Sequence, residues 1–139
     1  MSAPTSLKLL FAGLGLALSL PVLAHGDAEG GEKVVVQQEQ KLADAPGKKG
    51  LMVTVAYEPG QKSIAHVHSG SVFAYVLEGA VVSQLGDQPP VTYQAGQSWY
   101  EPANIPHRVS RNASDKKPAK LLVWLLLDEN APVLTPLKP

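Results

Sequence analysis

Short β-type segments, each ended by turn residues, recur along most of the chain and constrain its fold more than any other feature. β-branched and aromatic residues dominate these segments, and Gly, Pro, Asn and Asp fill the breaks between them. Their spacing of roughly 8–12 residues is typical of β-sandwiches and β-barrels. The segments are 34–36, 51–57, 72–77, 80–85, 91–93, 99–101, 107–111 and 119–127. They predict an all-β fold in one domain, without internal repeats.

Long helices are not expected in this chain. Twelve prolines are spread over its 139 residues, and a proline inside a helix removes a hydrogen bond and clashes with the preceding turn. The run 121–127 is apolar throughout, which fits either a short helix or a strand buried on both faces. The all-β prediction favours the strand.

The first 24 residues resemble a secretory signal peptide. Lys8 supplies a positive charge, 9–20 is a run of 12 small and apolar residues, and Ala24 completes a cleavage motif. The run is shorter than the roughly 20 apolar residues that a membrane-spanning helix needs. We therefore expect cleavage after Ala24, a mature chain of residues 25–139, and a periplasmic or secreted location without membrane attachment.

Charge and cysteine content exclude several classes of function. Removal of Lys8 with the signal peptide leaves one basic residue fewer than the 12 acidic ones, so no basic stripe indicates a nucleic-acid partner. The chain has no cysteine, which excludes thiolate zinc sites, iron–sulfur clusters, cysteine nucleophiles and an acylated cysteine. A metal site in this chain must therefore use nitrogen and oxygen ligands.

Three of the four histidines are arranged as candidate metal ligands. His66 and His68 are two residues apart, and alternate residues of a strand point to the same face. His107 begins another β-type segment, and inward side chains from two strands converge in a closed barrel. Three neutral imidazoles with open positions suit Fe(II), Mn(II), Ni(II), Cu(II) or Zn(II). The alternative is a chance pair of exposed histidines without function.

The residues around these histidines resemble the two sequence motifs of small single-domain cupins. The first motif is similar to Gly60-(five residues)-His66-Val67-His68-(ten residues)-Gly79. The second is similar to Gly96-(five residues)-Pro102-(four residues)-His107. The resemblance covers about 51–127, and it implies a single-domain cupin jelly-roll β-barrel (RmlC-like) of six to eight strands, with the metal inside its mouth.

On this resemblance the chain divides into four parts. They are the signal peptide (1–24), a flexible leader with the first edge strand (25–48), the cupin barrel (49–130) and a C-terminal tail (131–139).

Three positions depart from the cupin motifs. The first motif usually carries a glutamate four residues after its second histidine, and Val72 stands there. A site of three neutral histidines leaves the metal's charge uncompensated and favours anionic or chelating substrates that bring their own oxygen ligands. Asn104 replaces a glycine of the second motif, but asparagine tolerates a positive φ and can keep the turn. Asn112 stands one place later than that motif's final asparagine.

Five further residues are candidates for the pocket around the metal: Tyr75, Gln84, Trp99, Tyr100 and Glu101. They could orient an aromatic or carbonyl substrate. For Trp99 a role in the core is favoured over stacking on a ligand. Glu101 has two interpretations: an acid in a surface turn, which is favoured because acids are rarely buried unpaired, or a group that reaches the metal through water.

Three functions remain open at this point. The leading hypothesis is an exported metal-binding cupin of the quercetin-dioxygenase-like type, an oxygen-dependent enzyme acting on a small oxygen-chelating substrate. The second is a non-catalytic cupin that binds or senses a metal or a small ligand, and the third is a purely structural barrel. A homodimer stays open as the assembly. No nucleophile–base pair, phosphate loop or zinc-protease motif supports a hydrolase or a kinase.

Overall fold

The computed structural model describes residues 30–138, which form strands and turns without a helix. The all-β prediction is confirmed, and the apolar run 121–127 is a strand. The predicted signal peptide lies outside the described residues, as does most of the stretch between it and the first strand. Nothing within 30–138 forms a helix of the length and hydropathy that crossing a membrane requires.

Residues 30–138 contain ten strands, more than the six to eight expected, because two of them have only two residues each. In chain order they are β1 (Lys33–Lys41), β2 (Lys48–Tyr57), β3 (His66–Val67), β4 (Ser71–Glu78), β5 (Ala80–Leu85), β6 (Val91–Gln94), β7 (Ser98–Glu101), β8 (His107–Asn112), β9 (Ala119–Asp128) and β10 (Thr135–Pro136).

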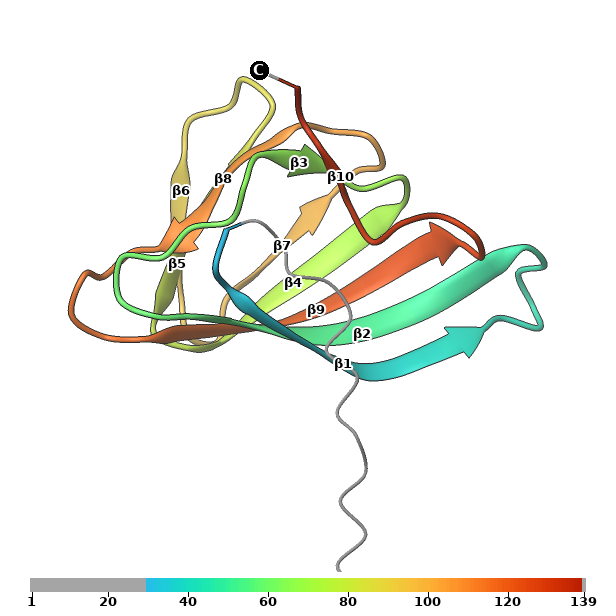
Figure 1. The fold of residues 1–139 in the computed structure, drawn as a ribbon, viewed down its shortest axis with the longest axis horizontal. Helices are drawn as coiled ribbons and strands as arrows, with labels where there is room; N and C mark the ends of the chain where they lie inside the picture. The colour runs from blue at the N-terminus through green and yellow to red at the C-terminus, as the bar shows by residue number, and fades with distance from the viewer. Residues whose placement is uncertain (1–29, 139) are drawn as a thin grey trace, which may run out of the picture.

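Two five-stranded antiparallel sheets enclose the core (Figure 1). The first sheet has the order β1-β2-β9-β4-β7, and the second has the order β10-β3-β8-β5-β6. Most neighbouring strands are distant in sequence, as β2 and β9 are, because the chain crosses repeatedly from one sheet to the other. This jelly-roll arrangement brings side chains from widely separated segments into one interior.

Strand β9 lies at the centre of the first sheet, between β2 and β4. Its side chains alternate between the core and the outer face, so Leu121, Val123, Leu125 and Leu127 are buried while the residues between them are half-buried. The expectation of a strand buried on both faces is therefore wrong. The outer face is only partly covered, by contacts such as that of Trp124 with a neighbouring aromatic ring.

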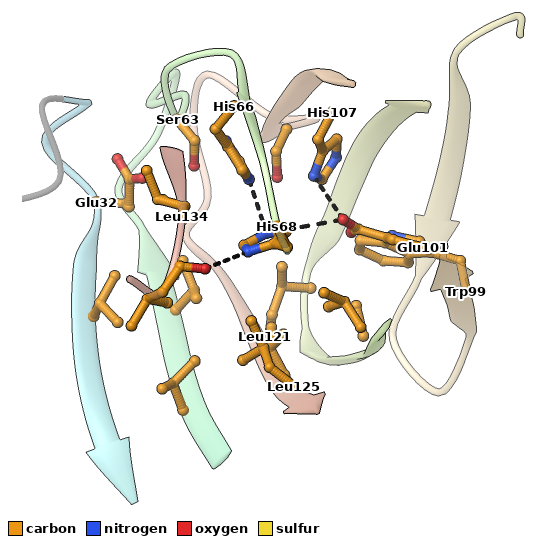
Figure 2. Close-up of a pocket in the computed structure, with 18 of the residues that line it drawn as sticks. Glu32, Ser63, His66, His68, Trp99, Glu101, His107, Leu121, Leu125 and Leu134 are labelled. Carbon is orange, nitrogen blue, oxygen red and sulfur yellow. Dashed lines mark hydrogen bonds and ion pairs between the residues drawn. The ribbon is translucent and has the colours of Figure 1, made fainter. Parts of the chain in front are cut away.

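The interior of the barrel is apolar at one end and polar at the other. Leu121 and Leu125 lie in the apolar part, below the histidines in Figure 2. The buried polar side chains at the other end come mainly from the second sheet and from β7. They are Glu32, His66, Ser83, Glu101, His107 and Ser110. Each polar group in this buried cluster needs a bonding partner, because an unpaired buried polar group costs roughly 1–3 kcal/mol.

The C-terminal segment extends the second sheet beside β3. Thr135 pairs with Val67, and Pro136 pairs with His66. On its other edge β3 pairs with β8. The segment predicted as a C-terminal tail therefore contains a strand, and the two residues of β3 are held from both sides.

Candidate metal centre

The structure brings the three predicted histidines together. His66 is the first residue of β3 and His107 is the first residue of β8, where the two face each other in register. His68 follows one residue after β3, and its side chain turns back toward His66 (Figure 2). One ring nitrogen from each of the three lies within 4.8 Å of the others, in a group that could hold a metal ion. His66 and His107 are buried, and the His68 side chain is 12% exposed.

Hydrogen bonds to backbone carbonyls set the tautomers of the first two histidines. His66 Nδ1 lies 2.7 Å from the Ile64 carbonyl oxygen, and His68 Nδ1 lies 2.6 Å from the Val133 carbonyl oxygen. A carbonyl only accepts, so each Nδ1 must carry the hydrogen and donate it. In the neutral rings both Nε2 atoms then present lone pairs, and these two atoms are only 3.1 Å apart.

A proton between the two Nε2 atoms is disfavoured by the surroundings. Burial lowers the pKa of His66 to about 4 and also lowers the pKa of His68, so both rings are neutral near pH 7. Two lone pairs facing each other in a buried site repel unless a cation lies between them. Metal-binding histidines commonly donate their second ring nitrogen to a carbonyl in this way.

Glu101 lies beside the histidines and is only 3% exposed. Its Oε1 accepts a hydrogen bond of 2.8 Å from the Trp99 indole. Its Oε2 is 3.2 Å from His107 Nδ1 and 3.9 Å from His68 Nε2. The favoured interpretation of Glu101 as a surface-turn acid is wrong, because alternation along β7 turns Glu101 inward together with Trp99.

The charge state of Glu101 is decided by its neighbours. Burial acts to raise its pKa. Contact with His107, proximity to His68 and the hydrogen bond from the Trp99 N–H act to lower it. Together they outweigh burial, so the net pKa is lowered. The site therefore contains an ionised carboxylate beside the neutral imidazoles of His66 and His68 near pH 7.

Ser83 is a site residue that the sequence reasoning missed. Its hydroxyl lies 2.9 Å from His107 Nε2, and the residue is buried on β5. This contact leaves Nδ1 as the His107 nitrogen that faces Glu101. A usable signal was present: Ser83 is a polar residue at an inward position of a strand that also buries Val81.

The other predicted pocket residues separate into two groups. Trp99 is buried, stacks on Tyr93 with ring centroids 4.6 Å apart, and contacts the site through its N–H. Tyr75, Tyr100 and Gln84 do not line the cavity around the histidines. The two tyrosines are nearly half exposed on the outer face of the first sheet, because they are one residue out of phase with the inward positions of β4 and β7.

A second polar group lines the same cavity and was also missed. The Tyr57 hydroxyl is 2.7 Å from Ser63 Oγ and 2.8 Å from Ser110 Oγ, with Glu32 close by on the cavity wall. Glu32 lies in the predicted flexible leader, yet it is buried.

Two of the departures from the cupin motifs have structural explanations. Asn104 adopts φ 61°, as expected for a residue in a glycine position, and its backbone N–H donates to the His68 carbonyl oxygen over 2.7 Å. Val72 is fully buried and pairs directly with Glu101 across the β4–β7 ladder. Val72 therefore lacks the carboxylate usual at its position in the first motif, but the carboxylate of Glu101 lies beside it on the neighbouring strand.

Comparison with known proteins identifies the class to which this fold and site belong. The cupin domain family matches residues 53–125, more than half of the chain. The chain belongs to the cupin family. None of the curated proteins matches it.

Solved structures share the fold. A conserved double-stranded β-helix protein from Klebsiella pneumoniae is 19% identical, with a TM-score of 0.60 over 78% of this chain and 85% of that one. A DMSP lyase structure is 20% identical, with a TM-score of 0.56 over 64% of this chain and 44% of the other. The protein TT1209 from Thermus thermophilus is 34% identical, with a TM-score of 0.50 over 63% of this chain and 82% of that one.

The donor groups of the site fit a divalent transition metal. Imidazole nitrogens suit iron, nickel, copper and zinc, whereas calcium and magnesium prefer sites built from oxygen alone. Two buried polar atoms of the described residues, Glu101 Oε2 and His107 Nδ1, have no hydrogen-bond partner although they face each other. Unpartnered buried acceptors that converge on one point are what a missing cation would leave behind.

Proposed function

We propose that this chain is a metal-binding cupin whose His66, His68 and His107 hold a divalent transition metal that takes a small oxygen-chelating ligand. The observation that carries the proposal is the pair of His66 and His68 Nε2 atoms, 3.1 Å apart and each left with a lone pair by its tautomer. Their tautomers are set by carbonyl oxygens on the far side of each ring. A metal ion satisfies both lone pairs without protonating either ring.

The size of the cavity supports a small ligand. Its volume is about 80 Å³, well below the roughly 300–1,000 Å³ of pockets for drug-sized molecules. The Tyr57 hydroxyl and its two serine partners provide polar contacts on one wall, and apolar side chains such as Leu121 exclude water from the other. The chain's own residues would thus orient a ligand of a few atoms against the metal.

The reaction that we propose is an oxygen-dependent, dioxygenase-like oxidation. A redox-active metal in this position would supply Lewis acidity toward substrate oxygens and electrons for the reduction of O₂. The small cavity also favours a second candidate, a non-catalytic module that binds or senses the metal or a small ligand. The same fold hosts both kinds of protein, so the choice between them depends on turnover.

Metal analysis tests this proposal. Protein purified without chelators, or reloaded separately with Fe(II), Mn(II), Ni(II), Cu(II) and Zn(II), is expected to carry a near-stoichiometric amount of at least one of these metals by elemental analysis. Oxygen consumption with small chelating acids and ketones then separates the enzyme from the binding module. Failure to retain any of the five metals would overturn the proposal.

We also propose that the protein acts after export. Support comes from the N-terminal pattern of Lys8, the apolar run 9–20 and Ala24. The intact mass of the protein recovered from the exported fraction is expected to equal that of residues 25–139. Recovery of the uncleaved chain from the cytoplasm alone would contradict this proposal.

A further inference from the structure

We propose that Glu101 is a fourth protein ligand of the metal, so that the centre consists of three histidines and one carboxylate. This inference rests on the proposed metal site. It assigns a direct role to a residue that is not one of the defined positions of either cupin motif. Glu101 comes from β7, in the first sheet, whereas His66 and His107 come from the second. The ion would therefore link the two sheets.

The two shortest distances between donor atoms fit a shared ion. Two ligand atoms that each lie about 2.1 Å from one ion are about 3.0 Å apart at a right angle and about 3.4 Å apart at a tetrahedral angle. Glu101 Oε2 is 3.2 Å from His107 Nδ1, and the two Nε2 atoms of His66 and His68 are 3.1 Å apart. A third distance, 3.9 Å from Glu101 Oε2 to His68 Nε2, connects these two pairs and is longer than either.

Each donor group is anchored at one end and free at the other. Carbonyl oxygens hold the Nδ1 atoms of His66 and His68, Ser83 holds His107 Nε2, and the Trp99 indole holds Glu101 Oε1. The atoms left over are two Nε2 atoms, His107 Nδ1 and Glu101 Oε2, and they converge on one place (Figure 2). Four independent anchors that leave four converging acceptors are the arrangement of a preorganised metal site.

The unsatisfied atoms favour direct ligation over a hydrogen bond. Oε2 of Glu101 and Nδ1 of His107 are both buried, and neither makes a hydrogen bond of acceptable geometry within residues 30–138. If Glu101 only oriented His107, Nδ1 would donate to it and Nε2 would bind the metal. Nε2 is instead engaged by the Ser83 hydroxyl.

A carboxylate ligand changes what the centre can accept. Three neutral imidazoles leave the charge of a divalent ion uncompensated, whereas the Glu101 carboxylate neutralises one of its two positive charges. An octahedral ion would then have two positions left, which fits one chelating ligand with two oxygen donors. The inward neighbour of Glu101 across the ladder, Val72, adds no donor and keeps that wall apolar.

Co(II) binding to the full chain and to Glu101→Gln tests the inference. Glutamine preserves the shape and the Trp99 hydrogen bond but removes the anionic donor. We expect the Kd for Co(II) to rise at least about 10-fold, because even an indirect partner of a ligand costs 10–100-fold. The visible spectrum of bound Co(II) is expected to change because one oxygen ligand is lost. The metal-free variant is expected to unfold at the same or a higher temperature, since the glutamine amide can donate to His107 Nδ1.

The matched control is Glu58→Gln, which removes one negative charge from an exposed turn outside the cavity. It should leave the Kd and the spectrum unchanged. Unchanged affinity and spectrum in Glu101→Gln would overturn the inference while leaving the three-histidine site standing. A weaker Kd with an unchanged Co(II) spectrum would also overturn it, because Glu101 would then act through His107. Failure of the unmodified chain to bind Co(II) or any of the five metals named above would refute the metal site itself.

Discussion

Replacing His66 with alanine is expected to weaken transition-metal binding by more than about 100-fold, because loss of a ligand should exceed the 10–100-fold effect of losing a ligand's supporting contact. His66 lies at the centre of the site, since it pairs with His107 in register and faces His68 across 3.1 Å. Competition of the variant with a chelator of known affinity, with Co(II) or Zn(II) as the metal, measures the effect.

The variant is expected to stay folded without metal. It loses the hydrogen bond to the Ile64 carbonyl, but it also removes one of two lone pairs that repel each other. The matched control is Gln84→Ala on β5 of the same sheet, where the side chain donates to the Gln88 carbonyl outside the cavity. Circular dichroism should superimpose for both variants. Retention of wild-type affinity in His66→Ala would contradict the proposed centre.

Replacing Asn112 with alanine is expected to lower the free energy of unfolding by about 3 kcal/mol or more. The side chain is 2% exposed and makes three hydrogen bonds. Its Nδ2 donates to the carbonyl oxygens of Glu58 and Lys117, and its Oδ1 accepts from the Ser114 backbone N–H. Alanine removes all three hydrogen bonds and leaves these backbone groups without their side-chain partner.

Urea denaturation of the metal-free proteins measures this cost. Asn130→Ala is the matched control, because Asn130 is exposed in a turn after β9, and such surface changes usually stay within about 0.5 kcal/mol. If Asn112→Ala were as mild as the control, the loops that follow β2 and β8 would not depend on this side chain.

The three histidines and the turn at Asn104 were predictable. The spacing of His66 and His68, the distant His107 and the positive φ of Asn104 were all expected from residue type and position, and each is found in the structure. These features follow from local geometry, which the sequence pattern carries directly.

Glu101 and Ser83 were harder to place because their burial depends on which residue of a short strand points inward. A strand of four residues such as β7 allows either phase, and a shift of one residue exchanges its two faces. The wrong phase puts Tyr100 in the pocket and Glu101 in solvent, whereas the surface-turn interpretation of Glu101 came from the general rarity of unpaired buried acids. The buried indole of Trp99 was the better guide, because residues two apart share a face.

The role of Val133 was not predictable from residue type at all. Its contribution is a backbone carbonyl, which every residue has, and its position depends on how the chain returns after β9 to pair with β3. Pairing between strands that are far apart in sequence leaves no local signature.

This return of the chain also determines when the centre can form. His68 and the carbonyl that sets its tautomer are separated by 65 residues, and both strands that flank β3 lie later in the sequence than β3 itself. Contacts of this kind form late in folding, because long loops must close first. Metal loading should therefore follow completion and folding of the whole chain, in contrast to short zinc motifs, whose folding the metal itself drives.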